Sequence, residues 1–476
     1  MPWQSATSAR EAKPPEQAIV LPYEKSGREL TRSAEYAIIK GVNPQTSSET
    51  RDHPTRETPL AQLGESRVLR AFMPIIEAHN ERVANALRAS GRTEALEVGP
   101  GDDCAVLTPS TDRTVVTTDT LVQNQDFMDP WPGGFDGTHS SGYEVGRKSA
   151  TQNLADVAAM GARPVSLFVS LSLPGETPYG WVEDFARGLV DGVHACGAED
   201  CAIAGGDMGA SSEISVTVTA LGRTDRPVLR SGAQAGDTLA LAGRTGWADA
   251  GVRLLLNPLS RPALVLLKGI ANGGLSHDPL PEIPLSEGLL DLVGTLNSAE
   301  AAEMLEACEC AIDAQMRPVS PVPFGEVARD AGANAMLDVS DGLVKDAGRI
   351  ARASDVQIHL DEAAVDALAA PLLPVARLLL TIVERNEGAE SPASLARAFV
   401  LGGGEDHGLL AAFPAEVPEG FTILGSCRVD RAGRAHSADP LAGGHYGAGH
   451  RGTLAAGSVL MDGAPLSELG WEHYGA

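Results

Sequence analysis

The spacing of hydrophobic residues separates a polar N-terminal stretch from the rest of the chain. Residues 1 to about 57 are rich in Ser, Thr, Glu, Arg and Pro and have weak periodicity, which predicts a flexible extension. Directly afterwards, the apolar spacing of "PLAQLGESRVLRAFMPII" is that of a helix. We therefore expect ordered structure to begin near residue 58.

Strand and helix patterns alternate between residues 58 and 228. "PVSLFVSLSLP" predicts a buried strand, and "SGYEVGRKSATQNLADVAAMGA" predicts a helix that ends at Gly161. Three- and four-residue spacings place Gln152, Asn153 and Asp156 on one side of that helix. "EISVTVTALG" alternates apolar and polar residues, which is typical of a half-buried antiparallel strand.

A second region begins near residue 229. "RSGAQAGDTLALAGRTGWADAGVRLLL" predicts a strand, a turn and a helix, and residues near 257–310 form a Pro-, Leu- and Glu-rich insertion. Regular patterning resumes at "FGEVARDAGANAMLDVSDGL". We expect an extension over 1–57, a first domain over 58–228 and a second domain over 229–476.

Composition narrows the class of protein. Hydrophobic residues make up 43% of the chain, aromatic residues only 4%, and there are 52 glycines, which favours an α/β or α+β enzyme with many tight turns. The net charge of −26 argues against nucleic-acid binding, which depends on clustered Lys and Arg. Anions must then be approached through metal ions or local dipoles.

The chain carries no pattern of export or membrane insertion. Six scattered cysteines include no CxxC pair, and the N-terminus lacks a basic-then-apolar signal. The most apolar run, "APLLPVARLLLTIV", is interrupted by Pro374 and Arg377 and is too short to span a bilayer. These features predict a soluble, cytoplasmic protein without a membrane partner.

Candidate chemistry lies in five acidic motifs next to small residues: "GPGDDCA", "TTDTL", "NLADVAAMG", "GGDMG" and "LDVSDG". Small neighbours let the backbone approach a ligand, and carboxylates without His or Cys partners suit magnesium. Each motif alone is more simply explained as a turn, a cap or a solvated helix face. Five motifs of the same chemistry together favour a magnesium-assisted phosphoryl transfer.

The motif "LDVSDG" gives the clearest indication of a bound cation. Asp338 and Asp341 lie three residues apart at the end of what the pattern predicts to be a buried strand. Two such carboxylates repel each other and lose hydration, so we expect a bound cation to offset them.

The ordered set "GDDCAVL", "TTDTLV", "GRKSATQNLADVAAMGA", "GGDMG", "RSGAQAGD", "LDVSDGL" and "GGGEDH" resembles the thiamine-monophosphate kinase family, within the aminoimidazole ribonucleotide synthetase and selenophosphate synthetase superfamily. The resemblance covers residues 58–476 apart from the insertion. It implies two α+β domains, α/β-sandwich-like, with mixed or antiparallel sheets backed by helices, and a homodimer formed through the first domains. It also implies in-line transfer of the γ-phosphoryl group of ATP to thiamine monophosphate, assisted by several magnesium ions.

The same resemblance assigns residues by motif. Metal ligands are implied at Asp103, Thr117, Thr118, Asp119, Asp156, Asp207, Asp338 and Asp341. Asp119, Asp156 and Asp207 would also be the catalytic residues. ATP contacts are implied at Gly206, Asp207, Arg230 and Ser340, and substrate contacts at Asp126, Glu405 and Trp471. Trp471 is equally explained as a packed C-terminal aromatic, and Arg230 as a surface residue that forms an ion pair.

Two positions depart from the family pattern. Asp126 stands where the family has a histidine after "TDTLV", and His407 stands where it has a tyrosine after "GGED". Both changes concern recognition of the substrate more than of ATP. They keep open a second reading, in which the chain is a non-catalytic or differently specific homologue that binds ATP and magnesium.

Overall fold

The computed structural model describes residues 54–101, 104–134, 140–273, 286–382, 391–429 and 457–467. The chain divides into residues 1–53 and a compact unit that begins at Pro54. Arg56, within the expected extension, already belongs to this unit. Its guanidinium forms ion pairs with Glu183, at 2.7 Å, and with Asp184.

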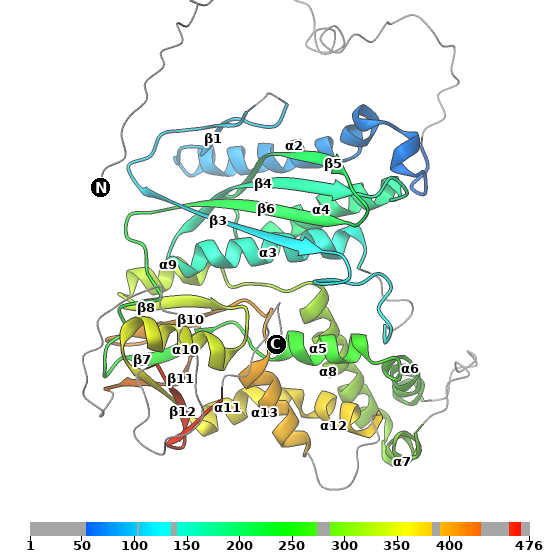
Figure 1. Cartoon of the computed structure of the whole chain (residues 1–476), viewed down its shortest axis with the longest axis vertical. Helices are drawn as coiled ribbons and strands as arrows, with labels where there is room; N and C mark the ends of the chain where they lie inside the picture. Colours follow the sequence, from blue (N-terminus) through cyan, green and yellow to red (C-terminus); the bar gives the residue numbers. More distant parts are fainter. Residues whose placement is uncertain are drawn as a thin grey trace, which may run out of the picture. The chain divides into compact units, whose positions relative to one another are not determined.

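The first half of the compact unit is built on a four-stranded sheet (Figure 1). Its strand order is β3-β6-β4-β5, and only the β4–β5 pair is parallel. Side chains of β6 are alternately buried and half-buried, which confirms the predicted alternation of "EISVTVTALG". The elements of this half are η1 (Leu60–Gln62), α2 (Glu65–Ala89), β1 (Leu96–Val98), β2 (Val106–Leu107), β3 (Arg113–Val122), α3 (Gly142–Ala159), β4 (Arg163–Leu173), α4 (Tyr179–Ala195), β5 (Ala202–Ala210) and β6 (Ser215–Thr224).

Helices α3 and α4 pack unusually closely. A Cβ added at Gly142 or Gly146 would overlap backbone oxygens of α4, and one at Gly188 would overlap the backbone of Tyr143 on α3. A capping box fixes the start of α3, because the Ser141 side chain accepts a hydrogen bond from the Tyr143 N–H while Glu144 accepts one from the Ser141 N–H. The sequence thus fixes where α3 begins and how closely it packs against α4.

The second half contains a seven-stranded sheet in the order β13-β12-β9-β11-β7-β10-β8, in which only β12 and β9 are parallel. The two sheets confirm the expected α+β class with mixed and antiparallel sheets. Its strands are β7 (Thr238–Ala242), β8 (Ala335–Val339), β9 (Gln357–Leu360), β10 (Gly408–Phe413), β11 (Phe421–Arg428), β12 (Val459–Met461) and β13 (Ala464–Pro465). Its helices outside the insertion are α5 (Trp247–Leu256), α9 (Pro323–Asp330), α10 (Leu343–Ser354), α11 (Glu362–Ala369), η2 (Ala370–Leu372), α12 (Leu373–Ile382) and α13 (Pro392–Gly402).

Where it is described, the expected insertion is helical. It contributes α6 (Ser260–Ala271), α7 (Glu287–Thr295) and α8 (Ser298–Met316), which pack against α5 and α12. Among the described residues, one helical stretch, Glu362–Ile382, is long and apolar enough to cross a membrane. The α5–α6 pair passes the same test only as a span bent by 107°. Val365, Val375 and Leu378 of the first stretch lie in the hydrophobic core of the second half.

Helix α3 joins the two halves. It contacts β3, β4 and β6 of the first sheet and β8 and β10 of the second, and Figure 1 shows it running between the two sheets. One hydrophobic cluster therefore contains residues of both halves, among them Leu154 on α3 and Leu409 on β10. Polar residues of α3 that face this junction are therefore candidates for a functional site formed by both halves.

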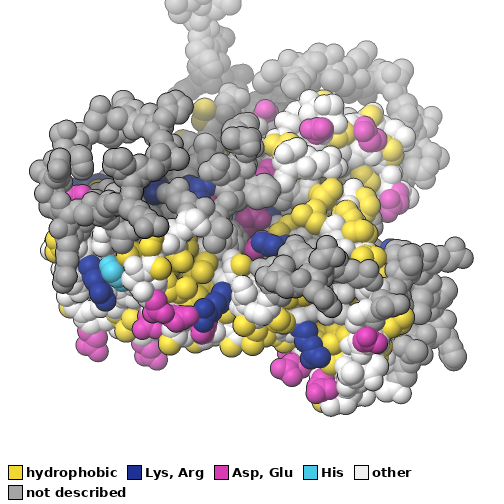
Figure 2. All heavy atoms as spheres, turned by 60° about the horizontal axis from the view of Figure 1, so that its bottom comes forward, with side chains coloured by type: hydrophobic (Ala, Val, Ile, Leu, Met, Phe, Trp, Pro, Cys, Tyr) yellow, Lys and Arg dark blue, Asp and Glu magenta, His cyan; other side chains and the backbone are white. Residues whose placement is uncertain are grey.

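The described surface carries no single continuous charge pattern on the face drawn in Figure 2. There Lys and Arg side chains are scattered among acidic and hydrophobic ones. This distribution agrees with the strongly acidic composition of the chain.

Candidate active site

An acidic cluster forms where β3 faces α3. Alternate residues of a strand point to opposite faces, so Thr117 and Asp119 share the face that is covered by the helix. The Thr117 hydroxyl donates a hydrogen bond to Asp156 on α3, with 2.5 Å between the oxygens. A motif on a strand and a motif on a helix, 39 residues apart in the chain, thus meet in one place.

The second half adds Asp338 to this cluster. Asp338 lies in β8, one of the strands that α3 contacts, and it is almost fully buried. Its carboxylate is 3.1 Å from Nδ1 of His407, which is also buried. The predicted residues Asp119, Asp156 and Asp338 therefore lie within electrostatic reach of one another.

The electrostatics of the cluster show unbalanced negative charge. Burial, reinforced by the charge of Asp338, raises the pKa of Asp156 to about 7 even though the Thr117 hydroxyl bond works in the other direction. Burial and Asp338 also raise the pKa of Asp119. Burial alone would lower the pKa of His407, but its hydrogen bond to Asp338 and the negative charges of Asp338, Glu405 and Asp156 together outweigh that effect and raise it. His407 is thus the cationic counterpart of Asp338.

Glu405 belongs to a different arrangement, in which the charge is already balanced. Oε1 of Glu405 is 3.0 Å from Nζ of Lys148, a residue of α3 that is only 3% exposed. Oε2 accepts a hydrogen bond from the Gln315 amide at 2.7 Å, and Lys148 also donates to the backbone oxygen of Asp126 at 3.0 Å. Burial would raise the pKa of Glu405, but Lys148, the Gln315 hydrogen bond and the charge of His407 together outweigh burial and lower it.

The loop that carries Glu405 and His407 is held against the end of β8. The Glu405 N–H donates to the Ser340 oxygen at 2.9 Å, and the His407 N–H donates to the Val339 oxygen at 3.2 Å. Both residues have positive φ angles, 65° and 52°, a conformation that costs energy for residues other than glycine and clusters at functional sites. A Cβ on Gly404 would overlap Ser340, so "GGGEDH" and "LDVSDG" form one packed unit.

The donor set fits magnesium chemically. Asp119 and Asp156 are half-buried carboxylates that pair with no Lys or Arg among the described residues, and their raised pKa values show that a cation would be stabilising there. Hard oxygen ligands of this kind suit a divalent ion such as Mg²⁺. Across the described ranges, no three Asp, Glu, His or Cys side chains are already arranged to hold an ion.

Comparisons with known proteins agree with the family resemblance of the sequence motifs. Residues 101–224 match the family model for AIR synthase related protein, N-terminal domain. The thiamine-monophosphate kinase of Mycobacterium tuberculosis (strain H37Rv) is 34% identical over 381 residues, which are 79% of this chain and 89% of that relative. The chain belongs to the thiamine-monophosphate kinase family. The Corynebacterium glutamicum thiamine-monophosphate kinase is 32% identical over 68% of this chain and 80% of its own length.

Solved structures show the same fold. The thiamine-monophosphate kinase of Stenotrophomonas maltophilia K279a is 25% identical, with a TM-score of 0.51 over 81% of this chain and 97% of that one. AaThiL complexed with AMPPCP and TMP is 22% identical, with a TM-score of 0.50 over 88% of this chain and all of that one. These likenesses confirm the expected thiamine-monophosphate-kinase fold.

Not every residue implied by the family motifs lies in the acidic cluster. The side chain of Thr118 is on the opposite face of β3, where its hydroxyl bonds to Thr219 at 2.8 Å, so only its backbone faces the cluster. Asp207 is on β5, three strands from β3, or about 14 Å at the usual strand spacing. The pairing register also places its side chain on the same face as that of Thr118. Within one chain, Asp207 is therefore not a neighbour of Asp119.

Gly206 precedes Asp207 in β5. A Cβ at this position would overlap the backbone of Val169, so only glycine lets β4 and β5 approach as closely as they do. The close approach gives Gly206 a structural role, and its implied contact with ATP stays a prediction.

The two implied ATP contacts Arg230 and Ser340 lie at opposite ends of β8. Leu229, next to Arg230, accepts a hydrogen bond from Met336 near the start of β8, whereas Ser340 follows its last residue. Arg230 is exposed, as the alternative interpretation from the sequence allowed.

Asp338 and Asp341 differ from the simple picture of two carboxylates awaiting one cation. Asp341 pairs with Arg349, and its carboxylate is 3.7 Å from Lys345, while Asp338 pairs with His407. Asp346, which is buried, accepts hydrogen bonds from the N–H groups of Asp341 and Gly342 and also pairs with Arg349. Side chains of the protein therefore offset part of the charge of each aspartate, and the bound cation expected at this pair stays a prediction.

Two implied site residues, Asp103 and Trp471, lie outside the described residues. At the departures from the family pattern, the structure gives each residue a clear local role. The Asp126 carboxylate accepts a hydrogen bond from the Val122 N–H at 2.7 Å and so closes the turn after β3. His407 pairs with Asp338, as described above.

Sequence reasoning did not single out Lys148 or Gln315. Lys148 had a readable signal, because residues 148, 152 and 156 are spaced by four and fall on one face of a helix with Asp156. Gln315 had none, since it comes from the end of the inserted helix α8 and reaches Glu405 only through the tertiary fold.

Proposed function

We propose that this protein phosphorylates thiamine monophosphate to thiamine diphosphate, with ATP as phosphoryl donor. The observation that carries the proposal is the acidic cluster. In a chain of this family, motifs from both halves bring Asp119, Asp156 and Asp338 to one junction, where their negative charge is only partly offset. Relatives over most of the chain carry the name of this activity.

In the proposed site, Asp119, Asp156 and Asp338 would hold Mg²⁺, together with the implied ligand Asp103. Bound magnesium supplies electrostatic stabilisation of the charge on the transferred phosphoryl group. The protein itself contributes the placement of these carboxylates, fixed by the Thr117 hydroxyl on one side and His407 on the other. The acceptor is a phosphate oxygen that is ionised near neutral pH, so the chemistry needs no strong general base.

Glu405 would face the cationic ring of the substrate. Lys148 and Gln315 each bind one of its oxygens, which fixes the plane of the carboxylate while the side chain stays partly exposed. Preorganisation of this kind lets a binding group act without being reordered when the substrate arrives. Lys148 also holds the Asp126 turn, so one ammonium group joins both sides of the proposed substrate site.

The test is direct. Purified protein is mixed with ATP, magnesium and thiamine monophosphate, and thiamine diphosphate is measured by chromatography. Asp313→Asn, which changes an exposed residue of α8 that pairs with Arg317, is the matched control for variants of the cluster. ATP hydrolysis without thiamine diphosphate, or no ATP consumption at all, would favour the second candidate, a non-catalytic or differently specific homologue that binds ATP and magnesium.

We also propose a cytoplasmic homodimer. The support is the exposed face of the first sheet, where Thr118 bonds to Thr219 and Thr120 bonds to Thr217, each at 2.8 Å, and where Val116 is 64% exposed. An open sheet face of this kind is a natural surface for a second copy of the chain. Sedimentation of wild-type protein and Val116→Arg tests this, and a wild-type monomer at micromolar concentration would refute the dimer.

A further inference from the structure

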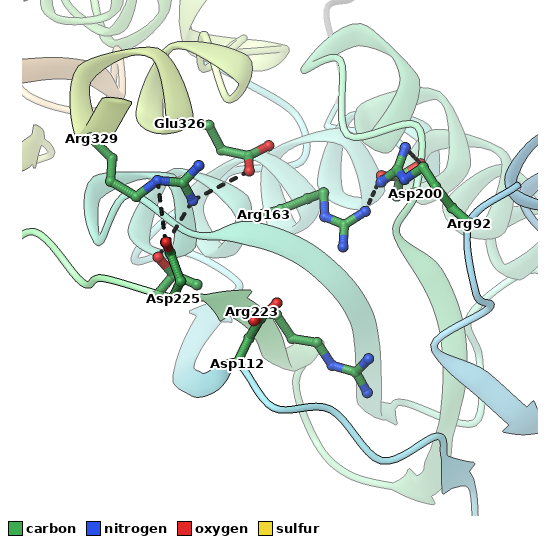
Figure 3. Close-up of a pocket in the computed structure, with 9 residues that line it drawn as sticks. Arg92, Asp112, Arg163, Asp200, Arg223, Asp225, Glu326 and Arg329 are labelled. Atoms are coloured by element: carbon green, nitrogen blue, oxygen red, sulfur yellow. Dashed lines mark hydrogen bonds and ion pairs between the residues drawn. The ribbon is translucent and has the colours of Figure 1, made fainter. Parts of the chain in front are cut away.

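A cavity of about 580 Å³ lies away from the acidic cluster, at the end of the first sheet where β4 begins and β6 ends (Figure 3). Four arginines and four acidic residues line it, together with Thr224, and α9 of the second half forms one wall. The volume is in the range of sites that hold small molecules. Neither the family motifs nor the proposed reaction makes use of this cavity.

The charges in the cavity are unevenly distributed. At one end, Arg329 is surrounded by Asp225, Glu326 and Asp330. At the other end, Arg92 and Arg163 share a single carboxylate, that of Asp200, with 2.8 Å between Arg163 and Asp200. Arg223 donates a hydrogen bond to the Thr108 backbone oxygen at 2.5 Å but makes no ion pair with any residue that the structure describes.

The strand pairing makes this excess of positive charge costly. Arg163 and Arg223 are direct partners in the antiparallel β4–β6 register, so the two side chains leave the same face of the sheet next to each other. Like charges in directly opposed positions are destabilising. Asp200 already pairs with Arg163, and Asp112 lies beside Arg223 (Figure 3), so the three arginines at this end face two carboxylates and a bound anion would offset the remaining positive charge.

We propose that this cavity, here called the arginine pocket, binds the phosphate group of a small molecule. Guanidinium groups from three separate segments, at Arg92, Arg163 and Arg223, line one end of the pocket. Their planar donor forks match phosphate oxygens, and three forks suit a tetrahedral anion better than a flat carboxylate. The volume leaves room for more than the phosphate group itself.

The arginine pocket is separate from the proposed phosphoryl-transfer site. Asp119 pairs with Val218 in β6, and Arg223 is five residues further along that strand, or about 17 Å. The side chains of Asp119 and Arg223 also point to opposite faces of the sheet. A ligand in the pocket would contact α9 as well as the first sheet, and would thus link the two halves of the compact unit.

The experiment is calorimetric titration of the full-length protein, without magnesium, with inorganic phosphate, inorganic diphosphate and citrate at matched ionic strength. The variants are Arg223→Gln and, as control, Arg187→Gln, which changes an exposed arginine of α4 that does not line the pocket. We expect diphosphate to bind more tightly than phosphate, and phosphate more tightly than citrate. Arg223→Gln should weaken diphosphate binding about tenfold or more, because it removes a charged donor, while Arg187→Gln should not change it.

Three results would overturn the proposal. These are the absence of binding to the wild-type protein, equal binding by wild type and Arg223→Gln, and tighter binding of citrate than of either phosphate compound. A folding defect is recognised separately, since Arg223→Gln removes a like-charge contact and should leave the ligand-free melting temperature unchanged or slightly raised. The proposal does not depend on the phosphoryl-transfer activity, and its failure would leave that activity untouched.

Discussion

Two sets of acidic groups lie at the junction of the two sheets, and the protein treats them differently. Asp119, Asp156 and Asp338 share the single cationic side chain of His407, and the pKa of Asp156 rises to about 7. Glu405, by contrast, pairs directly with the buried ammonium of Lys148 and accepts a hydrogen bond from the amide of Gln315, and its pKa falls. In the proposed function, the first set would receive a cation, whereas the second would orient the substrate.

The difference shows what a count of carboxylates would miss. All four residues are carboxylates in motifs with small neighbouring residues and look alike in the sequence. What separates them is the partner that the fold supplies, since a carboxylate that is deprived of water and of a counter-ion is destabilised in its charged form.

Asp156→Asn should have the largest effect. It keeps the size of the side chain and removes a charge from the cluster, so thiamine diphosphate formation should fall at least about 100-fold, equivalent to several kcal/mol of lost electrostatic stabilisation. The ligand-free protein should melt at a higher temperature than wild type. Steady-state kinetics and thermal melts measure the two effects, with Asp313→Asn as control, and near-normal turnover would remove Asp156 from the proposed site.

Lys148→Met should break the second set while leaving the first intact. The change leaves Glu405 without its cation, and because Glu405 is partly exposed we expect a loss of about 1 to 3 kcal/mol in the free energy of unfolding. The KM for thiamine monophosphate should rise more than kcat falls. The double variant with Glu405→Gln should recover part of the lost stability but not the KM, and full additivity of the two changes would show that the pair does not interact.

The pH dependence of stability should distinguish the first set of acidic groups from the second in the ligand-free protein. The pKa of Asp156 is near 3.8 in the unfolded chain and about 7 in the folded protein, so between these values the folded state binds more protons. The free energy of unfolding of the ligand-free protein should therefore fall as pH rises from about 4 to 7, by on the order of a few kcal/mol. Denaturant melts at several pH values test this, and Asp156→Asn should flatten the profile. An unchanged profile in that variant would contradict the assignment.

Removal of the N-terminal residues should have the smallest effect. The sequence predicts that residues 1–57 are dispensable, but Arg56 pairs with Glu183 and Asp184 on α4. Deletion of residues 1–53 should therefore leave both activity and melting temperature unchanged, whereas deletion of residues 1–57 should lower the melting temperature slightly, because exposed ion pairs contribute little. Lost activity in the shorter deletion would show that the extension contributes to the site.

The fold was largely readable from the sequence because its strands and helices have strong periodicity. The alternation predicted for β6 and the helix predicted before Gly161 are both found. The site was readable only in part. Asp119, Asp156 and Asp338 meet as expected, but the opposite orientation of Thr118 and the distance of Asp207 follow from sheet register and strand order, which no local motif encodes. The partners of Asp341 likewise depend on how α10 turns back on the strand end.

Helix α3 sets a fixed distance between two parts of the proposed site. Lys148 and Asp156 are eight residues apart on it, a span of about 12 Å along the axis. Gly142 and Gly146 contact the backbone of α4 directly, without side chains between the two helices, so α3 cannot easily shift along α4. The distance between Lys148, at the proposed acceptor site, and Asp156, at the proposed phosphoryl-transfer site, is consequently fixed by the helix. A homologue that accepts a substrate of another length would therefore need different loops around Asp126 and Glu405, while α3 keeps its length and position.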